Sequence, residues 1–266
     1  IPKTDKLSLI GDIDTQRIIN ADKEPHNWLA HGRDYYEQRY SPLDQINTKT
    51  IKDLELEWSL DMGTTRGLEA TPIVDNGIMF VSSTWSVIHA VDAKTGKELW
   101  VYDPNVPRSW ARKVCCDVVN RGVAVWKGKV FFGTIDGRLI SLDSKTGKVI
   151  WEINTLIDKE KDYTITGAPR IANGKVFIGN GGADMGGVRG YVSAYNTDNG
   201  NLEWRFFTVP GNPSLPFEHP ELEMAAKTWT GQWWTMGGGG TVWNSIVYDP
   251  EFNQVYICLL YTSDAA

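Results

Sequence analysis

The chain has 266 residues and a formal net charge of −6, and 41% of its residues are apolar and 23% charged. This is ordinary for a globular protein of one large or two small domains. No apolar run approaches the roughly 18 residues of a membrane span, and no basic block suited to phosphate backbones is present, so we expect neither membrane association encoded in this chain nor a nucleic-acid partner. The excess of Trp (12) and Gly (26) favours a turn-rich β protein over a helical bundle.

The first 45 residues carry few structural signals. Ile1 stands where a gene product would begin with Met, so either a signal peptide has been removed or the reading begins inside a gene. Asp14 can cap a short helix over residues 16–21, because its carboxylate can accept from the free amides of the first turn.

Three later segments resemble one another and end in Trp residues 51 and 53 positions apart: 90–100, 141–151 and 194–204. A shared turn and apolar strand precede each of them: 76–81, 127–133 and 173–179. A degenerate copy of the closing strand ends at Trp58, and a further copy of the unit opens over 240–249. Internal repeats of this length are the mark of a repeat architecture.

Each unit is predicted to form four strands separated by turns, in which Gly96, Gly147 and Gly200 supply positive φ. Four strands in about 50 residues is the period of a β-propeller blade. The closing Trp would give each blade a large flat side chain to pack against its neighbour. The repeats therefore predict an all-β propeller, and a β-sandwich with accidental similarity is the alternative.

Three polar residues occupy the same place in successive units, at the start of the first strand: Glu69, Arg121 and Thr166. Equivalent positions of propeller blades face the central axis from the same side, so these side chains are expected to converge. Each could merely cap its own strand. Convergence of all three favours a ligand site.

Cys115 and Cys116 are adjacent, in a chain with one other Cys. A metal site would need C-x-x-C spacing with more Cys or His nearby, and neither is present. The pair is therefore either two buried thiols or a vicinal disulfide. The disulfide is geometrically awkward, because neighbouring Cα atoms lie about 3.8 Å apart and disulfides prefer about 4.4–6.8 Å, so it requires an oxidising compartment and a rigid setting.

Two glycine-rich segments follow, over 179–187 and 237–243. The first is a poor nucleotide fingerprint, because Asp184 holds the third glycine position and strands rather than a helix come next. It is either a bulged hairpin or a loop that lets backbone approach a flat ligand, with Asp184 as an oxygen donor for Ca²⁺. The second segment, 237–243, places residues without side chains next to Trp243 and so leaves room beside its ring. The four His residues have no metal spacing and are interpreted as structural or surface residues.

The last quarter of the chain contains a long connection over 210–234, with four Pro residues and a helical segment expected at 221–227. Long connections in compact domains are usually functional or covering structures. Residues 258–266 follow a strand-like run without a turn or cap. We interpret them as a truncation or a cloning scar and expect the domain sequence to extend over 1–257.

These features closely resemble the N-terminal half of the pyrroloquinoline quinone (PQQ) dependent alcohol dehydrogenases, especially the quinohaemoprotein branch. The resemblance runs over about residues 14–257. Its motifs are Glu-Gln-Arg-Tyr-Ser-Pro (37–42), Cys-Cys-Asp-Val-Val-Asn-Arg-Gly (115–122), Gly-Asn-Gly-Gly-Ala-Asp (179–184), Val-Arg-Gly-Tyr-Val (188–192) and Gly-Gly-Gly-Thr-Val-Trp (238–243). The Cys-Cys-x4-Arg element together with the Trp repeats is highly specific.

The resemblance implies an eight-bladed propeller, of which about the first half is present, with PQQ near its axis. A Cys115–Cys116 disulfide would cover one face of the quinone and Trp243 would stack on the other. The positions that match residues bonding the cofactor's oxygens and carboxylates are Glu69, Arg121, Thr166 and Thr241, and backbone contacts match Gly182 and Ala183. Asp184 matches a ligand of Ca²⁺, which some branches replace with a lanthanide.

The implied activity is oxidation of primary alcohols to aldehydes in the bacterial periplasm, with electrons passed to a cytochrome c or a quinone. The family's catalytic Asp lies beyond this chain's C-terminus, as does any haem c domain, so the catalytic residue is unknown and the fragment itself is expected to be inactive. Two departures concern Asp184: the family usually has Glu there, and the loop 184–189 is one residue longer, which puts direct metal ligation in question.

Two rivals remain at this point. A cofactor-free propeller scaffold of the outer-membrane assembly lipoprotein type would share the Trp repeats but would need neither the Cys pair nor Arg121. A membrane-bound glucose dehydrogenase-like protein is a second rival, against which the Cys pair argues by resemblance.

Overall fold

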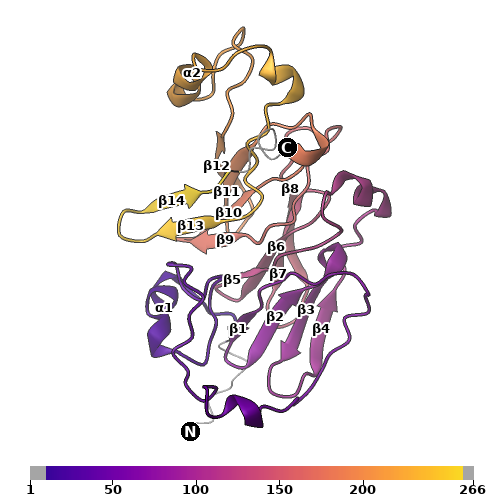
Figure 1. The fold of residues 1–266 in the computed structure, drawn as a ribbon, viewed down its shortest axis with the longest axis vertical. Coiled ribbons are helices and arrows are strands. Elements are labelled where there is room, and N and C mark those ends of the chain that lie inside the picture. Colours follow the sequence, from indigo (N-terminus) through magenta and orange to yellow (C-terminus); the bar gives the residue numbers. More distant parts are fainter. Residues whose placement is uncertain (1–9, 260–266) are drawn as a thin grey trace.

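A computed structural model describes residues 10–259 of the chain, and residues 260–266 of the predicted scar lie outside this range. Three four-stranded sheets and one two-stranded sheet follow one another along the chain (Figure 1). We refer to the four-stranded sheets as blades 1, 2 and 3. None of the helices in the described range has the length and apolarity that crossing a membrane requires.

Within each blade the strands are antiparallel and neighbour one another in chain order. Blade 1 consists of β1 Ile73–Asp75, β2 Ile78–Ser82, β3 Ile88–Asp92 and β4 Glu98–Tyr102. Blade 2 consists of β5 Ala124–Trp126, β6 Lys129–Gly133, β7 Arg138–Asp143 and β8 Val149–Asn154. Blade 3 consists of β9 Arg170–Ala172, β10 Lys175–Gly179, β11 Tyr191–Asn196 and β12 Leu202–Phe207. The hairpin of β13 Ile246–Asp249 and β14 Gln254–Ile257 follows, and the predicted four-strand unit is thereby confirmed.

The helices are short and lie outside the sheets. Helix α1 spans Thr15–Ile19, and Asp14 caps it by accepting from the Arg17 amide at 2.8 Å, so the predicted cap is confirmed although the helix ends two residues early. Helix α2 spans Pro220–Ala226, one residue from the prediction, within a connection that extends away from the blades (Figure 1). Six 3-10 helices complete the described elements: Ala21–Lys23, Ile51–Asp53, Thr84–Ser86, Arg108–Lys113, Ala183–Met185 and Trp233–Met236.

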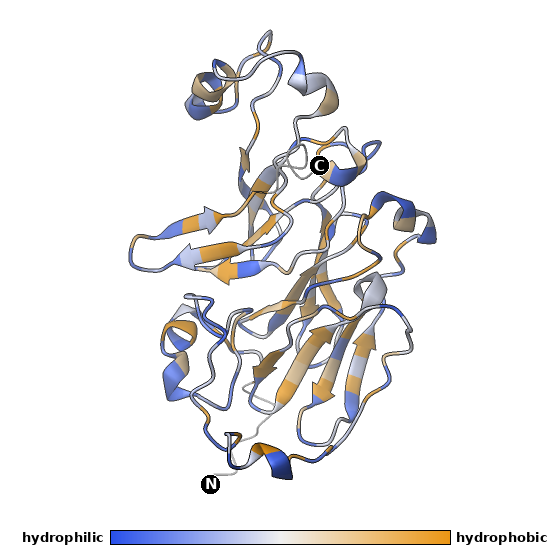
Figure 2. Cartoon of the chain, viewed as in Figure 1, coloured by the Kyte–Doolittle hydropathy of each residue, from blue (hydrophilic) through white to orange (hydrophobic). Residues whose placement is uncertain are grey.

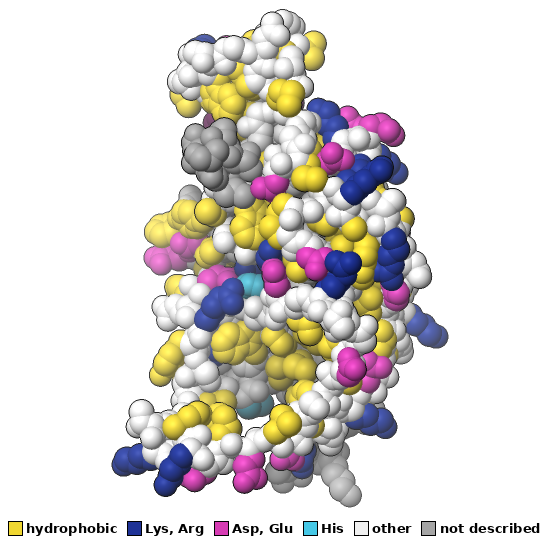
Figure 3. Space-filling model, turned by 45° about the vertical axis from the view of Figure 1, so that its right-hand side comes forward, with side chains coloured by type: hydrophobic (Ala, Val, Ile, Leu, Met, Phe, Trp, Pro, Cys, Tyr) yellow, Lys and Arg dark blue, Asp and Glu magenta, His cyan; other side chains and the backbone are white. Residues whose placement is uncertain are grey.

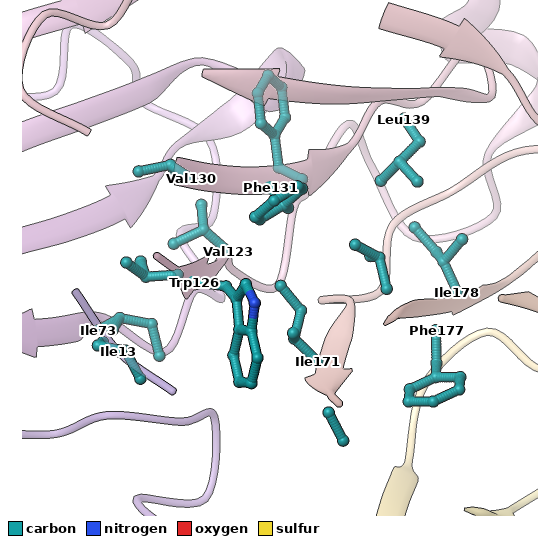
Figure 4. Close-up of a cluster of buried hydrophobic side chains, with 14 of the residues drawn as sticks. Ile13, Ile73, Val123, Trp126, Val130, Phe131, Leu139, Ile171, Phe177 and Ile178 are labelled. Atoms are coloured by element: carbon teal, nitrogen blue, oxygen red, sulfur yellow. The ribbon is translucent and has the colours of Figure 1, made fainter. Parts of the chain in front are cut away.

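The core lies between the blades rather than within one sheet. Hydrophobic residues lie along the strands of all three blades (Figure 2). In β6 four of five residues are buried, whereas no residue of the fourth strands β4, β8 and β12 is buried. Figure 4 shows where blades 2 and 3 meet, with Trp126 and Phe131 on one side and Ile171 and Phe177 on the other. On the face in Figure 3, acidic and basic side chains are interspersed between apolar ones, with no patch of a single charge.

Except for Trp204, which is 37% exposed, the closing Trp of each unit contacts the unit that follows it. Its indole Nε1 donates to a carbonyl there: Trp58 to Ala93 at 3.1 Å, Trp100 to Ser144 at 3.0 Å, and Trp151 to Thr197 at 3.2 Å. The ring covers the glycine of the next turn: Gly96, Gly147 and Gly200, all with φ near +70°. The predicted packing of Trp against the neighbouring blade is confirmed.

The predicted closing strand before Trp58 is wrong as secondary structure. Trp58 packs against Gly96 as the repeat requires, but residues 54–60 form no strand. A strand exists through hydrogen bonds to a neighbour. Within residues 10–259 this segment pairs with no strand, and the adjacent blade consists of β1–β4 alone.

Candidate functional site

A cavity of about 120 Å³ lies where four connections between strands meet. These connections join β4 to β5, β8 to β9, β10 to β11, and β12 to β13. The lining residues that sequence analysis singled out are Cys115, Cys116, Arg121, Thr166, Gly182, Asp184 and Trp243. The lining residues that were not named as site candidates are Val114, Val119, Thr164 and Gly181, of which Val119 and Gly181 lie in the motifs 115–122 and 179–184. Residues up to 129 positions apart, from 114 to 243, therefore form one site.

A larger groove of about 630 Å³ lies between blade 3 and the β13–β14 hairpin. Its walls are mainly apolar, including Phe177, Trp204 and Ile257, and Lys175 is its only charged lining residue. No residue singled out for chemistry lines it. We therefore place the candidate site at the smaller cavity, where charged, aromatic and sulfur groups meet.

Arg121 is the centre of the polar side of the cavity. Its Nη2 lies 2.8 Å from Glu69 Oε2, and its Nη1 donates to Thr166 Oγ1 at 2.7 Å. The backbone supports the same arrangement, because the Arg121 amide donates to the Thr166 carbonyl at 2.9 Å and the Thr71 amide donates to the Arg121 carbonyl at 3.2 Å. The three residues at equivalent repeat positions are thus in contact, and two different partners fix the guanidinium.

Aromatic and sulfur groups form other parts of the wall. Cys115 and Cys116 are joined in a disulfide, which decides between the two alternatives that the sequence left open. The Arg121 guanidinium carbon lies 4.7 Å from the centre of the Trp243 ring, a cation–π distance. The cavity therefore combines a cation, a flat aromatic face and an adjacent disulfide.

The connection between β10 and β11 supplies a wall made of backbone. Gly182 has φ +110°, and a Cβ at this position would lie 2.1 Å from the Asp162 carbonyl oxygen, so only glycine fits. Asp184 is exposed in the 3-10 helix Ala183–Met185 and lines the cavity. Within residues 10–259, no group of three or more His, Cys, Asp or Glu residues has the geometry of a metal site.

Three predicted site residues do not line the cavity. Glu69 reaches it only through its ion pair with Arg121. The Ala183 side chain packs in a separate apolar cluster with Tyr163 and Val188. Thr241 is buried two residues before Trp243. Their predicted part in binding a ligand stays a prediction.

Sequence analysis missed the residues that support the cavity from outside. Lys113 and Asp162 form an ion pair at 3.2 Å between two of the wall segments. Tyr163 Oη donates to the Arg189 carbonyl at 3.0 Å and accepts from its amide at 2.9 Å, and burial raises the pKa of Tyr163. The only available signal for Lys113 is its place two residues before Cys115, and the sequence offers no signal for its partner.

The blades and the cavity at their junction define a β-propeller with a site among its inter-strand connections. The family model for PQQ proteins described as "Glucose/ethanol/alcohol dehydrogenase, beta-propeller domain" matches residues 28–264. The chain therefore belongs to this PQQ-dependent dehydrogenase propeller family.

Individual relatives agree with this assignment. The chain is 56% identical over 255 residues to the quinohemoprotein alcohol dehydrogenase ADH IIB of Pseudomonas putida, covering 96% of this chain and 37% of that protein. It is 55% identical over 212 residues to the 1-butanol dehydrogenase (cytochrome c) of Thauera butanivorans, covering 80% of this chain and 30% of that protein. The crystal structure of the quinohemoprotein alcohol dehydrogenase of Comamonas testosteroni superposes with a TM-score of 0.92 at 52% identity, covering 96% of this chain and 38% of that chain. The chain thus spans about a third of the length of these relatives.

Proposed function

We propose that residues 1–257 are the N-terminal part of a longer PQQ-dependent alcohol dehydrogenase with an eight-bladed propeller. Three blades and a further hairpin in this chain amount to somewhat less than half of such a ring. The family assignment and the names of the relatives, which are alcohol dehydrogenases, support this proposal. The family model matches as far as residue 264, which argues against a scar over residues 258–264.

The groups around the cavity fit PQQ, a flat aromatic molecule with three carboxylates. The observation that carries the proposal is that Glu69 and Thr166 hold the Arg121 guanidinium over the ring of Trp243. A fixed guanidinium suits a carboxylate, because its donors form a rigid fork. An indole face suits an aromatic ring. Gly182 leaves its own position in the wall between β10 and β11 without a side chain.

We assign the residues the following roles toward this cofactor. Arg121 and Thr166 would bind its oxygens and carboxylates directly, with Glu69 and Thr241 at the edge of the site. Trp243 would stack on one face, and the Cys115–Cys116 disulfide would cover the other. Gly182 and Ala183 would contribute backbone contacts, since the Ala183 side chain is engaged elsewhere.

The bound quinone would supply the oxidising equivalents that convert a primary alcohol to an aldehyde, with Ca²⁺ or a lanthanide as Lewis acid. Asp184 would contribute one carboxylate to this ion, and the other six or so oxygen ligands that Ca²⁺ prefers would come from the cofactor and from other parts of the protein. Asp184 is the only carboxylate among the lining residues. We therefore assign the catalytic base to sequence beyond this chain, together with any haem c domain.

The electron acceptor and the compartment follow from the same proposal. One relative is named as a cytochrome c-linked enzyme, and we propose a cytochrome c, or alternatively a quinone, as acceptor. The disulfide supports a periplasmic location, because disulfides persist in oxidising compartments. A cofactor-free propeller scaffold would account for the Trp repeats, but it would leave the fixed Arg121 and the Cys pair without a role.

The test is to reconstitute the full-length protein with PQQ and Ca²⁺, follow PQQ binding by tryptophan fluorescence, and follow dye reduction by ethanol with and without a chelator. Arg121→Gln should weaken PQQ binding about 10- to 100-fold, the range expected for hydrogen bonds to charged groups. Arg112→Gln is the matched control, since Arg112 is exposed on the same connection and does not line the cavity. Absence of PQQ binding by the unsubstituted protein would refute the proposal.

A further inference from the structure

One side chain joins the disulfide segment to the opposite wall of the cavity. Lys113 comes just before the lining residues Val114, Cys115 and Cys116, and its side chain is only 15% exposed. Its ammonium lies 3.2 Å from Asp162 Oδ1, donates to the Lys161 carbonyl at 3.2 Å, and lies 4.4 Å from the centre of the Trp110 ring. A largely buried cation needs such partners, because losing one leaves its desolvation uncompensated.

Asp162 in turn belongs to a segment that is bonded to the glycine-rich connection. Thr164 and Gly181 exchange both backbone hydrogen bonds, at 2.7 and 3.3 Å. The Asp162 carbonyl packs against Gly182 so closely that a side chain there is excluded. The segment from Asp162 to Thr164 and the wall at 181–184 therefore form one unit.

We propose that Lys113 and Asp162 are a positioning pair that sets the separation between the Cys115–Cys116 disulfide and the wall formed by Gly182 and Asp184. The pair acts through these neighbours and does not line the cavity itself. Insofar as the cavity holds PQQ, this inference rests on the proposed function. Its consequence for the disulfide alone does not depend on any cofactor.

The experiment uses the full-length protein with Cys258→Ser as background, which removes the free exposed thiol. Lys113→Met keeps the length of the side chain without its charge, and Asp162→Asn keeps the shape of its partner. Lys113→Arg retains a cation that can bind both Asp162 and the carbonyl. Arg112→Met is the control, because it removes a neighbouring charge that is exposed to solvent.

Two rates are measured: reduction of the disulfide by dithiothreitol in cofactor-free protein, from released thiols, and dissociation of PQQ, from tryptophan fluorescence. Lys113→Met and Asp162→Asn should each raise both rates about tenfold, equivalent to about 1.4 kcal/mol. Lys113→Arg should return both rates to those of the unsubstituted protein.

Rates for Lys113→Met and Asp162→Asn equal to those of Arg112→Met would overturn the inference. If Lys113→Met fails to fold by circular dichroism, Asp162→Asn decides, since Asp162 is 40% exposed. If the unsubstituted protein does not bind PQQ, the proposed function fails, while thiol release still tests the pair.

Discussion

The indole ring of Trp100 covers Gly147, which lies 47 residues later in the next blade, so closely that a Cβ on this glycine would lie 2.7 Å from the ring. Trp100 also packs on Phe80 of its own blade, with ring centres 6.0 Å apart. The same arrangement recurs with Trp151, Phe131 and Gly200. One aromatic side chain thus connects two blades, and the glycine is the surface that receives it.

We expect Gly147→Ala to lower the free energy of unfolding by more than about 3 kcal/mol, because a left-handed backbone costs a non-glycine residue about 1–2 kcal/mol and the ring must also move. Gly128→Ala is the matched control, with φ +77° and no atom within 4 Å of the added Cβ. Gly128→Ala should lower the free energy of unfolding only by the cost of the left-handed backbone. Urea unfolding of the two variants measures the difference, and equal losses would mean that the Trp–Gly contact contributes nothing.

The turn between β2 and β3 contains two consecutive left-handed residues, Trp85 at φ +62° and Ser86 at φ +61°. Ser86 is fully buried, and its hydroxyl has no hydrogen-bond partner within the described part of the chain. Ser86→Gly should therefore stabilise the protein by about 0.5–1 kcal/mol, because it removes the strain and the unpaired group at some cost in unfolded-state entropy.

Thermal unfolding of this variant provides the measurement. Ser83→Gly in the same hairpin is the contrasting change, since Ser83 has extended backbone and its hydroxyl lies 3.2 Å from His89 Nε2. It should destabilise the protein. A lower unfolding temperature for Ser86→Gly would show that the strained turn has a compensating contact.

His31 is expected to make stability depend on pH. Burial, together with the charges of Arg170 and Arg39, lowers the pKa of His31 to about 3, against about 6.5 in an unfolded chain. The unfolded state therefore binds a proton that the folded state does not between these values. The stabilisation is complete above pH 6.5 and is lost as the pH falls toward 3, by up to about 1.4 kcal/mol per pH unit.

The measurement is urea unfolding at pH 7, 6 and 5 for the unsubstituted protein and for His31→Asn, which cannot titrate. The difference in unfolding free energy between the two should shrink as the pH falls. The other His residues are present in both proteins and cancel. A difference that is constant with pH would contradict the lowered pKa.

The disulfide joins adjacent residues, so it closes a loop with no intervening chain. In the chain-entropy picture its loss should cost only about 1 kcal/mol of global stability, compared with about 3 kcal/mol for a 15-residue loop. We expect Cys115→Ser with Cys116→Ser to unfold at nearly the same guanidinium concentration but to bind PQQ much more weakly. Cys258→Ser should change neither property, and a large loss of stability in the double variant would assign the bond a structural role.

Much of the fold could be predicted because the repeats carry their own turn chemistry. Gly96, Gly147 and Gly200 sit in turns that need positive φ, and the Trp that closes each unit has a fixed place in the period. The prediction of a strand before Trp58 was wrong because the local sequence determines only that Trp58 packs against the next blade. A strand forms only where a partner strand is available. Propensity alone does not supply that partner.

The candidate site was predictable where equivalent blade positions determine it, as for Arg121 and Thr166. It was not predictable where side chains meet across different connections, as for Lys113 with Asp162, because 48 intervening residues include the whole of blade 2. The state of the Cys pair could not be decided from spacing, since adjacent thiols suit both alternatives. Family resemblance pointed to the disulfide, and the structure contains it.

Because Trp58, Trp100 and Trp151 each face the blade that follows in the sequence, the packing surface of each blade is completed only when the next blade has been made. Trp100 has no surface to cover until Gly147 has been synthesised, and Trp151 waits for Gly200 in the same way. The cavity is completed later still, when Trp243 has been added. A cofactor could therefore be captured only by a chain whose first three blades are already made.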